Sequence, residues 1–287
     1  MSKFILNLPP QIIFLKTGCN IPLNSVENSP IQLVMEIGNF GISLMWINSL
    51  SMEISGLSVY VFDANEDPAD RIRFIFESQE FINAGATAVK LFYNYKESLL
   101  VPDKYFNEEL SAQMLSLLFG EDENVVTKFD VIEKMGTKNI YRVPAPIENI
   151  INQHISNHTV MHSTSIQLRK EAEGTVLNCI VFYDAIKVLL YINGQLYFVQ
   201  QFKYNNPEDV TYHLLNTCKQ HEIKPSEIKL NICGMIIEDS NLYQHLYNYF
   251  LNINFISIAE SIAVREEISN LPSHFFSHLT ELALCEL

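Results

Sequence analysis

The sequence lacks the short patterns by which many enzymes are identified. It contains no G-x-x-x-x-G-K-[ST], G-x-G-x-x-G, G-x-S-x-G or H-E-x-x-H pattern. The phosphate-loop, dinucleotide-binding, serine-hydrolase and zincin classes are therefore without their signatures. Positive charge is scarce as well, because 19 Lys and Arg stand against 33 Asp and Glu, for a formal net charge of −14. Such a surface repels phosphate backbones and anionic lipids, so we expect neither a nucleic-acid partner nor direct membrane insertion.

Cysteine is sparse and unpatterned. An odd number of cysteines without C-x-x-C spacing predicts buried thiols in a reducing compartment, with neither a disulfide framework nor a zinc site. The five are Cys19, Cys179, Cys218, Cys233 and Cys285.

The only extended apolar stretch near the N-terminus is Phe4–Ile21. It is interrupted by Pro9-Pro10, carries Lys16 and is followed by no small-residue cleavage site. We therefore predict neither a signal peptide nor a spanning helix, and a cytoplasmic location.

What the sequence does contain is a series of elements that occurs twice. Each half has three strand-like runs rich in β-branched and aromatic residues, a helix with a Pro at its first position, and a further strand. The helices begin at Asp67-Pro68 and Asn206-Pro207. The strands are expected at Ile31–Ile37, Ile42–Asn48, Leu57–Asp63 and Ala88–Tyr93, and at Val176–Tyr183, Ile186–Ile192, Gln195–Phe202 and Ile228–Cys233.

The halves align at two different offsets. A shift of 139 residues matches Pro68 with Pro207 and Lys90-Leu91 with Lys229-Leu230. Further on, a shift of 96 residues matches Arg169 with Arg265. Each half there has a helix (Ile147–Ile155, Leu242–Leu251) and a short strand (Thr159–His162, Asn254–Ile258).

The change in offset indicates 43 extra residues in the first half, between about Tyr95 and Pro144. They contain an amphipathic helix near Glu108–Phe119 and two strand-like runs, Lys128–Glu133 and Asn139–Val143. We therefore predict an N-terminal lobe over residues 1–174, with an inserted subdomain at about 96–143, and a C-terminal lobe over residues 175–287. The alternative is one mixed α/β domain in which the similarity arose by chance.

A β-β-β-α-β-α-β-α unit occurring twice resembles the ribonuclease-H-like lobes of the actin-like ATPase superfamily, which includes actin, sugar kinases, chaperone ATPases, FtsA and PilM. The whole chain also resembles an uncharacterised bacterial family, typical of Bacteroidetes, with this fold. The resemblance implies an α/β fold of duplicated lobes, each a mixed five-stranded sheet flanked by helices. It also implies an ATP–Mg²⁺ site between the lobes, held by an Asp-x-Gly hairpin turn in each lobe.

In the first lobe the corresponding turn reads Glu36-Ile37-Gly38-Asn39-Phe40-Gly41. Backbone N–H groups at glycines can approach phosphate oxygens, so Gly38, Asn39 and Gly41 are candidate phosphate contacts. Glu36 stands where the family has a metal-holding Asp, and its greater length puts the metal site in doubt. The plainer interpretation is an ordinary hairpin.

The second lobe departs further from the family pattern. Its turn, Asp184-Ala185-Ile186-Lys187, has the acid but no Gly, and Gly234 is the one glycine where relatives have a pair against adenosine. We therefore predict a vestigial site, no catalytic residue and no bound metal or cofactor. The function expected is a non-catalytic scaffold or interaction protein with an unknown protein partner, present as a monomer or homodimer. The alternative is an ATP-binding switch or kinase-like enzyme that uses ATP with Mg²⁺.

Two C-terminal features complete the expectations. His274 and His278 have the spacing of one helical face but no third metal ligand. The terminal helix expected over Ser273–Leu287 is apolar on one side and has no Lys or Arg. It is therefore expected to dock against the second lobe or a partner, in contrast to the basic membrane-binding helix of FtsA.

Overall fold

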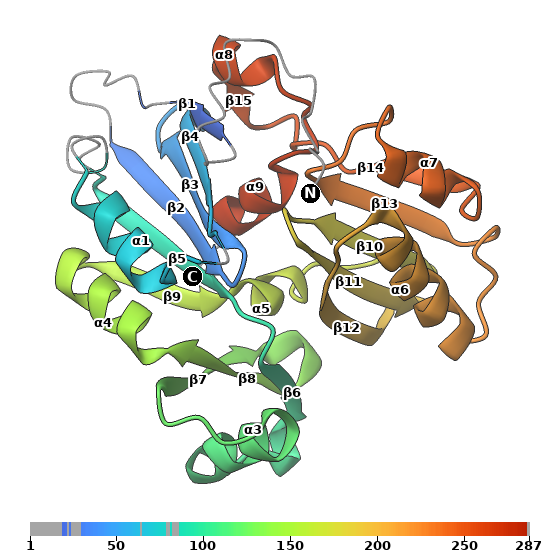
Figure 1. Ribbon diagram of the computed structural model, residues 1–287, viewed down its shortest axis with the longest axis horizontal. Helices are drawn as coiled ribbons and strands as arrows, with labels where there is room; N and C mark the ends of the chain where they lie inside the picture. Colours follow the sequence, from blue (N-terminus) through green and yellow to red (C-terminus); the bar gives the residue numbers. More distant parts are fainter. Residues whose placement is uncertain are drawn as a thin grey trace.

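The computed structural model describes residues 19–21, 23, 30–63, 65–78, 81 and 86–285, and Figure 1 shows two sheets facing each other across helix α9. The sequence also predicts that the helix beginning at Pro68 ends at Gly85, and this residue and most of the N-terminal apolar stretch lie outside the described residues. The first sheet has strands in the order β1-β4-β3-β2-β5-β9, and β15 also pairs with β4. Their bounds are β1 Cys19–Ile21, β2 Ile31–Gly38, β3 Gly41–Asn48, β4 Glu53–Val61, β5 Ala88–Asn94, β9 His158–His162 and β15 Ala263–Val264.

The second sheet has the five strands that the sequence predicts for a lobe, in the order β12-β11-β10-β13-β14. The first sheet has two more, because β1 and β15 both extend it at the β4 edge. The bounds in the second sheet are β10 Val176–Val181, β11 Ala185–Ile192, β12 Gln195–Lys203, β13 Lys229–Gly234 and β14 Asn252–Phe255.

The central strands form as expected for sheets covered on both faces. Strands β2 and β3 are buried along almost their whole length, and so is β11. Such strands read as continuous apolar runs rather than alternating ones. A single charged residue interrupts the run in β2, at Glu36, and in β11, at Lys187. Both side chains are buried.

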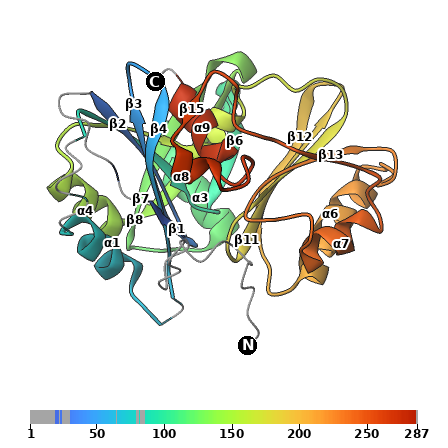
Figure 2. The ribbon, with the colours of Figure 1, turned by 90° about the horizontal axis from the view of Figure 1, so that it is seen from above.

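Helices cover the outer faces of both sheets, as Figure 2 shows from above. Helices α1 and α4 cover the first sheet, and α6 and α7 cover the second. Asp67 and Asn206 cap α1 and α6, and Pro68 and Pro207 occupy the first helical positions, as predicted. The bounds are α1 Pro68–Phe76, α4 Ala145–His154, α6 Pro207–Gln220 and α7 Asn241–Tyr247.

The second offset between the halves needs a correction. Strand pairing places Thr159 beside Lys90 and Asn252 beside Lys229, so these strands align at a shift of 93 residues rather than 96. The helices before them begin at equivalent positions, 145 and 241, but α4 has 10 residues and α7 only 7. The three residues missing from α7 account for the change.

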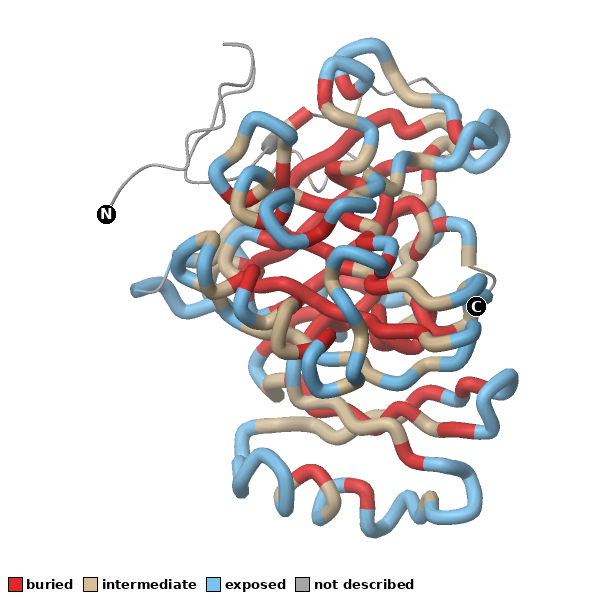
Figure 3. Tube along the Cα trace, turned by 90° about the vertical axis from the view of Figure 1, so that its right-hand side faces the viewer, coloured by how far each residue is buried: buried red, intermediate tan, exposed pale blue. Residues whose placement is uncertain are grey.

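The inserted segment folds into a small subdomain. It has the predicted helix and two predicted strands, and a further strand, β6, completes a sheet in the order β6-β8-β7. Helix α3 lies on the side of this sheet away from the rest of the molecule (Figures 1 and 3). The elements are β6 Ser98–Pro102, the short helices η1 Asp103–Tyr105 and η2 Glu108–Leu110, α3 Ser111–Phe119, β7 Val125–Ile132, the short helix η3 Glu133–Met135 and β8 Thr137–Pro144.

Two short helices, α5 Ser163–Gln167 and α9 Ser277–Leu284, lie between the two sheets, and α8 Glu266–Ser269 lies at the edge of the molecule near β15 (Figure 1). The expectation that the C-terminal helix docks on the second lobe is incomplete, because the apolar side of α9 packs mainly on the first sheet. Leu279 and Leu282 join a cluster with Val34, Met45 and Phe92 of that sheet. The helix therefore lies between the lobes (Figure 1) and carries His278 in its first turn.

Candidate functional site

The hairpin between β2 and β3 places Glu36 at the centre of the molecule. Gly38 pairs with Gly41, so Asn39 and Phe40 form a two-residue tip. Glu36, two residues before the tip, is completely buried. A buried carboxylate requires polar partners, because transfer of its charge from water is costly.

Side chains from both lobes supply those partners. Asn94 of β5 donates from Nδ2 to Glu36 Oε1 at 3.0 Å, and the Ser163 hydroxyl lies close enough to lower the pKa of the carboxyl group. His278 Nε2 of α9 lies 3.6 Å from Oε2. Glu36 and these partners therefore connect strands β2 and β5 of the first sheet to helix α9, which lies between the lobes.

Lys187 of β11 brings a positive charge from the second lobe. Its Nζ donates to Ser163 Oγ at 2.8 Å, and the side chain is buried. Ser163 therefore lies beside both the Lys187 ammonium and the Glu36 carboxylate. Burial raises the pKa of Glu36 and lowers that of Lys187, while the attraction between the two charges opposes both shifts. We call Glu36, Asn94, Ser163, Lys187 and His278 the interlobe polar cluster.

Two buried histidines, His278 of this cluster and His162, are neutral. Burial, and secondarily the Lys187 charge, lower the pKa of His278 to about 3. The same causes lower the pKa of His162 to about 3, and its Nε2 lies 2.9 Å from the Tyr95 carbonyl oxygen. Lys187 is therefore the cation at this position, and the imidazoles serve as neutral hydrogen-bonding and packing groups.

The second hairpin differs from the first at the equivalent positions. The N–H of Phe182 donates to the Ala185 carbonyl at 2.8 Å, so the two-residue tip is Tyr183-Asp184. Counted from the tips, Ile180 corresponds to Glu36 and Phe182 to Gly38. Asp184 lies at the tip, half-buried, where burial raises its pKa and the charge of Lys203 opposes that shift.

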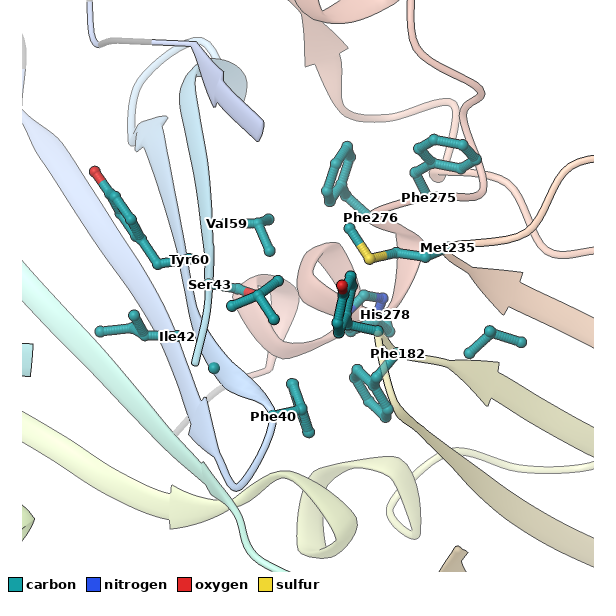
Figure 4. A pocket seen from close by; sticks show the side chains of 14 residues that line it. Phe40, Ile42, Ser43, Val59, Tyr60, Phe182, Met235, Phe275, Phe276 and His278 are labelled. Carbon is teal, nitrogen blue, oxygen red and sulfur yellow. The ribbon is translucent and has the colours of Figure 1, made fainter. Parts of the chain in front are cut away.

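The two hairpins meet directly. The rings of Phe40 and Phe182 stack with centroids 4.2 Å apart, and His278 packs edge-on against Phe182 at 5.5 Å. Figure 4 shows these three side chains at the boundary of the lobes, beside a cavity also lined by Phe276 and Met235. That cavity has a volume of about 20 Å³, which is room for about one water molecule.

The predicted glycines are required by the protein's own backbone. A Cβ at Gly38 would lie 2.6 Å from the Asn94 carbonyl oxygen. Gly234 has φ of +90°, and a Cβ there would lie 2.1 Å from the Val181 carbonyl oxygen. Close packing of strands therefore explains both residues without reference to a phosphate.

The predicted site residues are only partly brought together. Glu36, Gly38, Asn39 and Gly41 share the first hairpin, and Gly41 lines the small cavity. Asn39 is exposed at the tip. Gly234 ends β13, where its N–H donates to the His274 carbonyl at 2.9 Å.

Sequence reasoning missed the central role of Lys187 and of the two phenylalanines. The available signal was a single charge inside each of two apolar strands, of opposite sign in the two lobes, which indicates a buried ion pair. His274 donates from Nε2 to the Ile236 carbonyl oxygen at 2.6 Å. Among the described residues no cluster of three or more His, Cys, Asp or Glu side chains has the arrangement of a metal site.

Two lobes of this topology, facing each other through the hairpins of their first two strands, define the class of proteins with the actin-like ATPase fold. Residues 22–253 match the family described as "Protein of unknown function (DUF3822)", and the chain belongs to that family. No curated protein matches the sequence.

Solved structures confirm the fold that the sequence predicts. One is a protein with actin-like ATPase fold and unknown function from Bacteroides thetaiotaomicron, 16% identical, with a TM-score of 0.70 over 90% of this chain and 97% of that one. Another is the PilM–PilN type IV pilus biogenesis complex, whose matching chain is 13% identical, with a TM-score of 0.63 over 88% and 97% of the two chains. A third is the cytoplasmic domain of EpsL, an inner-membrane component of the Vibrio cholerae type II secretion system. It is 12% identical, with a TM-score of 0.50 over 90% and 96% of the two chains.

Proposed function

We propose that this protein is a non-catalytic interaction protein whose two lobes are held together by its own side chains instead of by a nucleotide. The observation that carries the proposal is the Phe40–Phe182 stack beside the interlobe polar cluster. Aromatic rings occupy the contact between the hairpin tips, where a phosphate-binding turn needs open backbone N–H groups.

The charges support the same proposal. The resemblance to actin-like ATPases implies a metal ion near the acid of the first hairpin. In this chain the buried ammonium of Lys187 supplies positive charge near Glu36, because the two charges attract each other. A Mg²⁺ ion requires several oxygen ligands in octahedral geometry, and the second hairpin provides Ile180 where the second acid would stand. The vestigial site at Glu36, Gly38, Asn39, Gly41, Asp184 and Gly234 is therefore proposed to bind no nucleotide.

The cellular setting is part of the proposal. Among the described residues no helix is long and apolar enough to cross a membrane. The thiols of Cys179 and Cys233 are buried in the second lobe, which suits a reducing compartment, and we place the protein in the cytoplasm. The PilM–PilN complex is named as an assembly of two proteins. By analogy we propose a protein partner for this chain.

Thermal unfolding with and without ATP and Mg²⁺ tests the proposal. A ligand at about a hundred times its dissociation constant would stabilise the native state by about 2.7 kcal/mol. The expected result is an unchanged midpoint for ATP, ADP and GTP. A rise in the midpoint that is removed by Gly38→Val or Glu36→Ala would support the alternative, a nucleotide-dependent switch or kinase-like enzyme.

A further inference from the structure

Helix α3 of the inserted subdomain is apolar on both of its sides. Leu115 is fully buried against the three-stranded sheet. On the side away from Leu115, Leu110 and Leu117 lie seven residues apart in one stripe, and the half-buried Met114 lies between that stripe and the sheet. The exposed fraction is 41% for Leu110 and 87% for Leu117. Large exposed apolar side chains that lie together on a helix mark a surface for another molecule.

The stripe is extended at the C-terminal end of the helix. Leu118 is 59% exposed and Phe119 is 39% exposed. Leu118 follows Met114 by four residues and therefore joins the stripe, whereas Phe119 lies on another side of the helix. The exposed leucines thus form a group rather than the scattered single residues that are normal on monomers. We call Leu110, Met114, Leu117 and Leu118 the α3 patch.

The α3 patch is held on a fixed support. Arg142 of β8 is buried and donates from Nη2 to Ser116 Oγ at 2.7 Å and from Nη1 to the Gly120 carbonyl at 2.9 Å. These hydrogen bonds provide partners for polar groups in and just after the last turn of the helix. A rigid apolar surface loses little conformational entropy when a partner binds to it.

Acidic side chains border the patch at both ends. Glu108 and Glu109 precede α3, and Glu121, Asp122 and Glu123 follow Gly120, all of them exposed. Acids after a helix C-terminus oppose the helix dipole, so helix stability does not explain the second group. Between residues 103 and 127 the only base is Lys104, which lies over the ring of Tyr105.

We infer that the α3 patch binds a basic amphipathic helix of a partner protein. The apolar side of that helix covers the leucines, and its Lys or Arg residues reach the acids at the two ends. A second copy of this chain is a poor occupant because the same acids would face each other, and an anionic membrane is disfavoured for the same reason. The inference rests on the proposed function only for the existence of a protein partner.

A fluorescein-labelled synthetic peptide of roughly 14 residues, with Leu at helical spacing and Lys elsewhere, is the probe. Its anisotropy is measured against the full chain at physiological salt. We expect saturable binding that weakens by about tenfold or more in Leu117→Ser/Leu118→Ser. The matched control is Leu50→Ser/Leu251→Ser, since Leu50 and Leu251 are also strongly exposed, 80% and 64%, but lie elsewhere. The control should bind as the unchanged protein does.

The charges are tested in the same assay. Glu121→Gln/Glu123→Gln should weaken binding several-fold, whereas Glu66→Gln/Glu260→Gln, at exposed acids outside the subdomain, should not. The inference is overturned by absence of saturable binding, by equal binding of Leu117→Ser/Leu118→Ser, or by equal binding of a peptide with Glu in place of Lys. Leucine-dependent self-association in sedimentation, or leucine-dependent binding to anionic vesicles, would also overturn it. Nucleotide binding in the thermal test would contradict the proposed function and leave this result unaffected.

Discussion

Replacement of Lys187 by Met is expected to expose how strongly the two lobes depend on the buried charges between them. The substitution keeps an unbranched apolar stem of similar size and removes the ammonium whose charge attracts the Glu36 carboxylate. Glu36 is completely buried, so its carboxylate would remain without a compensating cation. Removal of one member of a buried pair typically costs about 3–5 kcal/mol.

The cost here is expected near the middle of that range, at about 4 kcal/mol at pH 7.5. Glu36 can take up a proton when its cation is removed, and protonation of a carboxyl with an ordinary pKa costs about 1.4 kcal/mol for each pH unit above that value. Glu36→Gln alone should cost a similar amount because it leaves the Lys187 ammonium buried. The double variant Glu36→Gln/Lys187→Met should lose clearly less than the two single losses together, since no buried charge remains.

Urea unfolding followed by circular dichroism measures these free energies, provided that the slopes of the four proteins agree. Additivity of the two single losses within about 0.5 kcal/mol would refute the reasoning, because independent sites add. As a matched control, Lys170→Met/Glu281→Gln removes an ion pair that is 2.6 Å long but whose Lys is largely exposed. That pair should show a coupling energy of less than about 1 kcal/mol.

Three further predictions follow from the same structure. Burial raises the pKa of Glu36 from 4.5 to about 7, so the contribution of Glu36 to stability is full below pH 4.5 and is lost as the pH rises through 7. Relative to Glu36→Gln, the free energy of unfolding of the unchanged protein should therefore fall by about 3 kcal/mol over that window. A difference in urea unfolding that does not change with pH would contradict this prediction. Phe182→Ala removes the stacked contact with Phe40 and should lower the free energy of unfolding by about 3 kcal/mol. The control Tyr183→Ala, at the exposed tip, should lower it by well under 1 kcal/mol. Equal losses would show that the stacked contact does not stabilise the protein. Gly234→Ala should lower the stability measured by thermal unfolding several-fold more than Gly120→Ala does. Both residues have φ near +90°, but only a Cβ at Gly234 would contact another atom. Similar losses of stability in the two variants would mean that backbone strain, and not the contact, determines the effect.

Much of the fold could be predicted because local chemistry and burial agree along the chain. The Pro at the start of α1 and α6, each after an Asp or Asn cap, marks both helices correctly. Continuous apolar runs mark β2, β3 and β11. The strands that were missed are short or irregular. Strand β15 has two residues, and it forms because the chain crosses back to the first sheet. No local pattern specifies such a long-range pairing.

The candidate site was harder to predict because its members come from separate elements. Glu36 was identified as the acid of the first hairpin, but its partners lie far along the chain, on β5, α5, β11 and α9. The position of Asp184 was misjudged for a different reason. The second hairpin pairs through Phe182 and Ala185, and this register moves the acid from the base of the hairpin to its tip. Asp184 therefore lies four residues after Ile180, the position equivalent to Glu36, and residue types alone do not show this register.

Equilibrium dialysis of the purified protein against radiolabelled ATP with Mg²⁺ tests the central claim most directly, that the lobes are joined by their own side chains and not by a nucleotide. The structure predicts equal ATP concentrations on the two sides of the membrane, for the unchanged protein and for Glu36→Ala alike. Saturable retention of one ATP per chain, abolished by Glu36→Ala, would contradict it and would restore the nucleotide-dependent switch.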